Sequence, residues 1–121
     1  ADELRTGLYG GIGIQMGMLR DSLSVFTVFD NTPASFEGLN IGDYIVKIDS
    51  TLTNELSVRE CSKLIKGKVG TDVVLHIYRP SGRKRIEFVL TREKIALKKK
   101  LLLGRRLVPG LFFQDLVQLL T

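Results

Sequence analysis

The residues best suited to chemistry are three glycines that flank one isoleucine near the start of the chain. Gly10, Gly11 and Gly13 surround Ile12, and glycines allow successive backbone N–H groups to converge on a small concave anion site. A carboxylate bound there would accept charge-assisted hydrogen bonds worth about 1.5–3 kcal/mol each. We expect the donors to come mainly from Gly11, Ile12 and Gly13. The same pattern is also typical of an ordinary turn before a strand.

The other reactive side chains are isolated in the sequence. Cys61 is the only cysteine and His76 the only histidine, which excludes an internal disulfide, a multi-cysteine metal site and a histidine-rich metal cluster. Cys61 has no base near it in the sequence, and Ser57 is used as a helix cap, so no nucleophile–base pair is evident. We expect Cys61 to be a buried small hydrophobe, His76 a structural or partly exposed strand residue and Asp43 a turn-capping residue. No catalytic residue, metal or cofactor is expected.

The spacing after the glycines predicts the strand that would continue this site. Ile12, Ile14 and Met16 recur at every second position, so they share one face of a strand that we place at residues 12–18. These side chains either line a binding groove or belong to the core, and the pattern does not choose between the two. A second strand is expected at residues 24–29, after a turn.

A helix that could form a wall beside this strand is predicted from a capping box. Ser57 is a good N-cap, and Glu60 three residues later completes the box. We expect the helix at residues 58–66, ended by the glycine that follows. Cys61 and Leu64 lie on one helical stripe and are expected to face the core.

Turn signals organise the remainder of residues 7–95. A short helix is expected to begin after Asp30 or Thr32 and to end at Gly38. Strands are expected at residues 44–48 and 72–78, followed by a hairpin turn and one more alternating strand. The sequence therefore predicts an α+β, mostly β fold: a small antiparallel barrel or sandwich of five to six strands, capped by one long and one short helix.

Composition and charge limit the classes of partner. The chain has 121 residues, of which 44% are hydrophobic and 26% charged, and its formal net charge is +5. Residues 1–95 hold 13 Lys and Arg against 12 Asp and Glu, so most of the excess belongs to residues 96–121. A nearly neutral main domain argues against nucleic acid as a partner. No apolar run reaches the length of a membrane span, and we expect neither a signal peptide nor a membrane partner.

Residues 96–121 form a basic, leucine-rich tail that we expect to be partly helical. Its last ten or so residues place leucine and phenylalanine over a broad helical face, which would be an aggregation liability if left exposed. The tail could pack on its own domain, drive self-association through residues 107–121, or lie on an anionic membrane surface. Its final "LVQLLT" could also mimic a ligand in a neighbouring groove.

Three ordered segments carry a family resemblance. They are "YGGIGIQMG", "DNTPASFEGLNIGDYIVKID" and "LSVRECSKLIKGKVGTDVVLHIYR". Together they resemble the PDZ domain of the C-terminal processing (tail-specific) serine proteases, over residues 7–95. Ser50 stands where this family commonly has glycine, so we expect a strained or rearranged turn there.

The resemblance implies a peptide-binding module that captures the hydrophobic C-termini of proteins by β-strand addition, between strand 12–18 and helix 58–66. The glycine segment would hold the terminal carboxylate. Val58 stands where some PDZ domains carry a histidine, so an apolar residue is expected two positions before the peptide's end. The groove positions implied are Ile12, Ile14, Gln15 and Met16 on the strand, and Val58, Ser62 and Ile65 on the helix.

The resemblance also implies a longer parent protein. That protein would be a serine-type endopeptidase of the periplasm or an equivalent envelope or lumenal compartment, in which this domain recognises or gates substrates. The serine and lysine of the family's active site would lie beyond residue 121, so we expect no catalysis from this chain alone. The alternative function is a structural or adaptor domain whose hydrophobic tail drives self-association.

Overall fold

The main sheet has six strands, all paired antiparallel, as the sequence predicts. The computed structural model describes residues 9–95, 102–103 and 106–107. The strand order is β2-β3-β4-β7-β8, with β5 paired to β4, so β2 and β8 are the ends and the sheet does not close into a barrel. The strands are β2 (Ile14–Leu19), β3 (Ser22–Val28), β4 (Tyr44–Ile48), β5 (Thr51–Leu52), β7 (Asp72–Arg79) and β8 (Lys84–Thr91).

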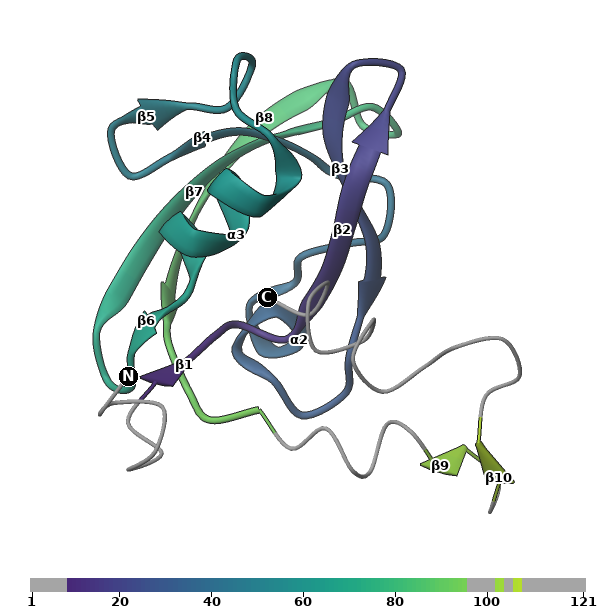
Figure 1. The fold of residues 1–121 in the computed structure, drawn as a ribbon. Helices are drawn as coiled ribbons and strands as arrows, with labels where there is room; N and C mark the ends of the chain where they lie inside the picture. Colours follow the sequence, from purple (N-terminus) through teal and green to yellow (C-terminus); the bar gives the residue numbers. More distant parts are fainter. Residues whose placement is uncertain (1–8, 96–101, 104–105, 108–121) are drawn as a thin grey trace.

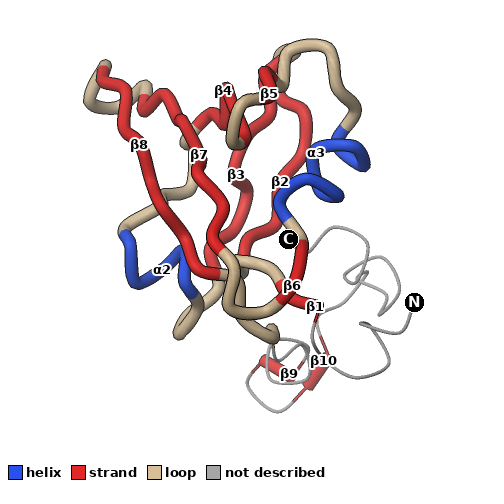
Figure 2. The backbone as a smooth tube through the Cα atoms, turned by 90° about the vertical axis from the view of Figure 1, so that its left-hand side faces the viewer, coloured by secondary structure: helices blue, strands red, loops and turns tan. Residues whose placement is uncertain are grey.

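Two short strand pairs and two helices complete the described elements. β1 (Tyr9–Gly10) pairs with β6 (Gly67–Lys68), and β9 (Leu102–Leu103) pairs with β10 (Arg106–Leu107). α3 (Val58–Ile65) lies beside β2 in both views, whereas α2 (Pro33–Glu37) lies at the other end of the sheet, near β8 (Figures 1 and 2). The long helix is therefore the one that accompanies the edge strand β2.

Both helices begin at the residues that the sequence indicates. Thr32 and Ser57 are the N-caps, and each forms a reciprocal capping box with the third helical residue. α2 ends at Gly38, whose φ of 94° is the left-handed conformation favoured at helix C-termini. α3 ends one residue earlier than predicted, at Ile65, because Lys66 is already extended and leads into β6.

The core lies between the sheet and α3. Its most buried side chains come from the alternating positions of β7 and β8, from β2, and from one face of α3. Alternation in the sequence placed Val73, Leu75 and Ile77 on one side of β7 and Phe88 and Leu90 on one side of β8, and these side chains are buried, because successive side chains of a strand point to opposite faces. The fully buried strand residues include Ile14, Met16, Val25, Ile45, Ile48, Val73, Leu75, Ile77 and Leu90.

Asp43 is a turn residue, as expected, and it also anchors β7. Its carboxylate accepts the backbone N–H of Asn40 at 2.8 Å and both the Nε and a terminal nitrogen of Arg79 at 2.9 Å. The Arg79 guanidinium also donates to Gly38 O at 2.9 Å. The hydrogen bond to Asp43 raises the pKa of Arg79, so the pair ties the end of α2 to the end of β7.

The turn at Ser50 is not strained at the serine. The left-handed residue is Asp49, with φ of 53°. Asp49 is held there by two hydrogen bonds to Val74, one to the backbone N–H at 2.9 Å and one to the carbonyl at 2.7 Å. Ser50 therefore takes a conformation that any residue can adopt.

Part of the prediction for the tail falls outside the described residues. Residues 102–103 and 106–107 form strands, while the helix expected near residues 111–120 and nearly all of the segment 107–121 are not described. Neither helix within residues 9–95 is long and apolar enough to cross a bilayer.

Candidate functional site

The glycine segment connects β1 to β2 and is held to the end of the domain at Gly11. The Gly11 N–H donates to Glu93 O at 2.9 Å, and the Glu93 N–H donates back to Gly11 O at 2.9 Å. Gly10 pairs with Gly67 in the β1–β6 ladder. The expectation that Gly11 donates to a ligand is therefore wrong, because this isolated bridge already uses its N–H.

Ile12 and Gly13 are held through their carbonyls. Ile12 O accepts from Ala34 N at 2.9 Å, and Gly13 O accepts from Phe29 N at 2.9 Å. Neither Ile12 N–H nor Gly13 N–H has an acceptor among residues 9–95. The φ of Gly13 is 92°, and a left-handed residue in such a turn can direct successive N–H groups toward one point. Two of the three predicted donors are therefore available.

The outer edge of β2 supplies a third donor that the sequence did not identify. Because Phe29 N–H bonds to Gly13 O, the next opposed pair, Ile14 and Val28, is a non-hydrogen-bonded pair of the ladder. Ile14 N–H and C=O therefore point away from β3. Met16 lies opposite Val25, whose N–H donates to Asp43 O and whose C=O accepts from Gly42 N–H, both just before β4. The N–H and C=O of Val25 therefore do not bond to Met16, and those of Met16 point outward.

The side chains predicted to line the strand side of a groove lie in the core. Ile12, Ile14 and Met16 are at most 1% exposed, and only Gln15 between them is half-buried. The sequence left groove and core open as alternatives for these residues. The structure assigns their side chains to the core and leaves their backbone at the sheet edge.

On α3, the buried face is rotated relative to the prediction. Cys61, Ser62 and Ile65 are buried, and Val58 packs partly buried against the core. Leu64 is 37% exposed, so the prediction that it faces the core is wrong. Successive residues of an α-helix are about 100° apart around its axis. Leu64 directly precedes Ile65, so its side chain points away from a buried face centred on Val58 and Ile65.

Arg92 holds α3 in place, and sequence analysis did not identify it. Its side chain is buried and donates to the last carbonyls of the helix, Ile65 O at 2.7 Å and Leu64 O at 3.1 Å. It also donates to Thr71 Oγ1 at 2.8 Å and to Asp72 O at 3.2 Å. A cation at a helix C-terminus is favourable because it satisfies carbonyls that have no partner in the helix. The only sequence signal was a basic residue directly after an alternating strand.

Cys61 is inert in this arrangement. Burial, followed by the nearby charge of Glu60, raises the pKa of its thiol, so the nucleophilic thiolate is disfavoured. We predict that a disulfide reagent at mildly alkaline pH will modify Cys61 at least about a hundredfold more slowly than in the urea-unfolded chain, because access requires opening of the core. Equal rates measured for the folded and unfolded protein would contradict this.

Within residues 9–95, no three His, Cys, Asp or Glu side chains lie together so that they could hold a metal ion.

Comparison with protein families and curated proteins gives consistent matches. Residues 10–90 match the family model described as PDZ domain. The carboxy-terminal-processing protease of Bartonella bacilliformis is 32% identical over 92 residues, which is 76% of this chain and 21% of that protein. The carboxy-terminal processing protease of Bacillus subtilis is 29% identical over 90 residues, 74% of this chain and 19% of that protein. The chain thus spans about a fifth of the length of these relatives.

Solved structures agree on the fold. A photosystem II D1 C-terminal processing protease superposes with a TM-score of 0.69 at 25% identity, covering 77% of this chain and 26% of that one. The PDZ domain of the carboxy-terminal protease from Vibrio cholerae, solved in complex with a peptide, superposes with a TM-score of 0.63 at 23% identity. It covers 74% of this chain and 99% of that one, so the shared unit has the size of a single domain.

Proposed function

The chain belongs to the PDZ-domain family, and its relatives are C-terminal processing proteases; on that premise, we propose that it binds the free carboxyl terminus of a protein as an added strand on β2. The match confirms the resemblance carried by the three sequence segments. The mode of binding and the residues that contact the peptide are part of this proposal.

The observation that carries this proposal is the backbone of β2. Ile14 and Met16 direct their N–H and C=O groups away from β3, at the open end of the strand order. An extended peptide can bond to such groups at every second residue, which gives affinity without requiring a particular sequence. α3 runs beside this edge (Figure 1), so a bound peptide would lie between strand and helix.

The terminal carboxylate would be held where β2 begins. The N–H groups of Ile12, Gly13 and Ile14 are the donors, and Gly11 is not among them. Hydrogen bonds to a charged group are worth about 1.5–3 kcal/mol each. A peptide without the negative charge would therefore lose most of this contribution, which makes the carboxylate the strongest requirement of the site.

Val58 sets the chemistry on the helix side. It is an aliphatic side chain at the first position of α3, partly exposed where the peptide would pass. It offers no hydrogen bond, so it favours an apolar peptide residue two positions before the end. The last residue of the peptide is expected to be apolar as well. Burial of one such side chain contributes about 1.5–3 kcal/mol, and after ordering costs we expect micromolar affinity.

The test compares one apolar peptide as the free acid and as the C-terminal amide, by calorimetric titration. We expect the amide to bind at least about tenfold more weakly, because at least one charge-assisted hydrogen bond is lost. Val58→Asp should weaken the free acid to a similar degree, while Leu64→Asp, on the exposed face of the same helix, should leave it unchanged. Equal affinities of acid and amide would exclude a carboxylate site.

We place this domain in a longer serine-type endopeptidase, where it would select substrates by their C-termini. The length of its relatives supports this, since the chain covers only about a fifth of them. In that setting the chain is a recognition domain without catalysis of its own, and the protein works in the periplasm or an equivalent envelope compartment. The adaptor alternative depends on residues 107–121, of which the structure describes only Leu107.

A further inference from the structure

An aromatic ring lies over a glycine on the outer face of β2, the face turned away from the core. Gln15, Gly17 and Leu19 share this face by alternation, and the buried Met16 points the other way. A Cβ built on Gly17 would lie 2.4 Å from Cε2 and 2.9 Å from Cζ of Phe26. The ring of Phe26 therefore covers the backbone of Gly17, where every other residue type would place a side chain.

A β-bulge puts the ring in this place. The register of the β2–β3 ladder shifts between Gln15 and Met16, and Phe26 is the extra residue of β3 at that shift. Gly17 pairs with Ser24, two residues before Phe26, and an aromatic side chain can reach across such a diagonal. The backbone of the hairpin thus fixes the ring beside Gly17. We call the surface formed by Phe26 and Gly17 the Phe26 subsite.

The Phe26 subsite is accessible from the open edge of the sheet. Phe26 is 46% exposed, and Leu19, next on the same face of β2, is 48% exposed. β2 is the end of the strand order, so no strand among the described residues pairs with it on its other side. A strand added to that edge would therefore meet the ring directly across Gly17.

The surroundings of the ring are uncharged. On the outer face of β2 and in the opposed positions of β3, the pairs are Gln15 with Thr27, Gly17 with Ser24, and Leu19 with Ser22. The hairpin turn carries one charge of each sign, Arg20 and Asp21. A charged side chain brought onto this surface would lose hydration without gaining an ionic partner, whereas an aromatic or aliphatic one gains contact with the ring.

The peptide path assigned to β2 brings one particular side chain onto this surface, a step that rests on the proposed function. A carboxylate held where β2 begins places the last peptide residue opposite Ile14, and the peptide then runs antiparallel to β2. Met16, whose backbone also points outward, faces the residue two positions before the end. Gly17 faces the residue three positions before the end, in a non-hydrogen-bonded pair with Cα atoms about 4.5 Å apart. Directly opposed side chains share one face of a sheet, so this one lies beside Phe26.

We propose that Phe26 determines a further specificity of the peptide site: it selects an aromatic or branched aliphatic side chain three positions before the peptide's last residue. Gly17 is the condition for this contact, because a side chain there would stand between ring and peptide. The last residue and the one two positions before it point to the opposite face of the bound strand, toward α3. The preferred C-terminus is then apolar at three of its last four positions, all but the next-to-last.

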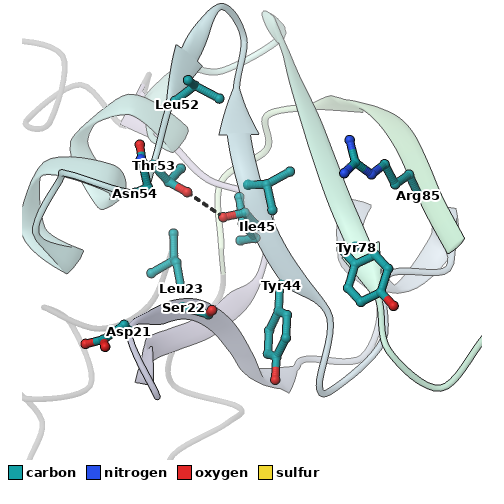
Figure 3. A pocket seen from close by; sticks show the side chains of 11 residues that line it. Asp21, Ser22, Leu23, Tyr44, Ile45, Leu52, Thr53, Asn54, Tyr78 and Arg85 are labelled. Carbon is teal, nitrogen blue, oxygen red and sulfur yellow. Dashed lines mark hydrogen bonds between the residues drawn. The ribbon is translucent and has the colours of Figure 1, made fainter. Parts of the chain in front are cut away.

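An exposed leucine on another part of the sheet provides a matched control. Leu52 is 62% exposed and lines a cavity of about 550 Å³ between β4 and β5 (Figure 3). Neither Phe26 nor Gly17 lines that cavity or the neighbouring one of about 430 Å³. Leu52→Ala therefore removes exposed apolar surface away from the peptide path.

The test uses the chain of 121 residues and the free-acid peptide acetyl-Ala-Ser-Phe-Leu-Ser-Leu, with two analogues that carry alanine or lysine in place of phenylalanine. By calorimetric titration, we expect the phenylalanine peptide to bind about threefold to tenfold more tightly than the alanine peptide, because of the added aromatic contact. The lysine peptide should bind no more tightly than the alanine peptide. Equal affinities of the phenylalanine and alanine peptides, or a lysine peptide as tight as the phenylalanine peptide, would overturn the proposal.

Variants assign the preference to the ring. An aromatic ring over a strand glycine also stabilises a sheet, so the readout is the ratio of two peptide affinities within each variant. Phe26→Ala should bring the phenylalanine and alanine peptides within about twofold of each other, and Gly17→Ala should do the same because its Cβ displaces the ring. Phe26→Tyr and Leu52→Ala should keep the full ratio. An unchanged ratio in Phe26→Ala, or in Gly17→Ala if the first variant does not fold, would refute the subsite.

The same titrations separate this proposal from the proposed function. If the alanine peptide bound equally well as free acid and as amide, the carboxylate site and the Phe26 subsite would both be wrong. If the free acid bound more tightly but phenylalanine gave no advantage over alanine, only the Phe26 subsite would be wrong.

Discussion

Replacing Gly13 with alanine should destabilise the protein by roughly 2–5 kcal/mol and remove most of its affinity for peptide C-termini. Two effects combine. The φ of 92° is unfavourable for any residue with a Cβ, and the added Cβ would lie 2.2 Å from Thr32 Cβ. Thr32 is the N-cap of α2 and also donates to Phe29 O at 2.7 Å, so it cannot move without loosening both elements.

Gly38→Ala is the matched control for this prediction. Gly38 has nearly the same φ, 94°, but nothing lies within 4 Å of its added Cβ. Gly38→Ala should therefore lower the free energy of unfolding only by the strain of the left-handed backbone, about 1–2 kcal/mol, and leave peptide affinity unchanged. Urea denaturation gives the stabilities, and titration with a free-acid peptide gives the affinities. If Gly13→Ala and Gly38→Ala lost similar amounts of stability and peptide affinity, the contact with Thr32 would not explain the effect of Gly13→Ala.

Arg92→Ala should destabilise the protein by roughly 2–4 kcal/mol, because it leaves the buried carbonyls at the end of α3 without donors. The helix would lose its connection to Thr71 and to β7. A less fixed helix also holds Val58 less well beside β2, so we expect peptide affinity to fall about threefold to tenfold. Arg92 acts here as a positioning residue, since it does not touch the proposed peptide path.

Two further variants separate geometry from charge. Arg92→Lys keeps the charge but cannot reach several acceptors at once with a planar fork, so we expect it to recover less than half of the lost stability. Arg59→Ala, an exposed position on the same helix, should change stability by no more than about 0.5 kcal/mol. If Arg92→Ala unfolded at the same urea concentration as Arg59→Ala, the role assigned to the buried guanidinium would be wrong.

Local signals predicted the elements well. The capping box at Ser57 located the start of α3, and Thr32 was one of two candidate caps for α2. The alternation at Ile14 and Met16 placed a strand directly after the glycines. These features depend on neighbours within four residues, so the sequence contains all the information they need. The prediction failed for Leu64 because the direction that a short helix buries depends on what it packs against.

The candidate site was predicted in part. Ile12 and Gly13 remain as donors, but Gly11 is used by Glu93, which lies more than 80 residues away along the chain. No local pattern reports a contact between such distant segments. The same holds for Arg92, whose importance comes from carbonyls on a helix that precedes it by 27 and 28 residues.

The amino-acid order alone determined the kind of elements, their approximate limits and the family, because caps, turns and side-chain alternation are short-range properties. Only the tertiary structure decided which backbone groups of β2 face outward and which amides are already bonded. These outcomes follow from strand register and long-range hydrogen bonds. A shift of register by one residue would reverse them without changing any local signal.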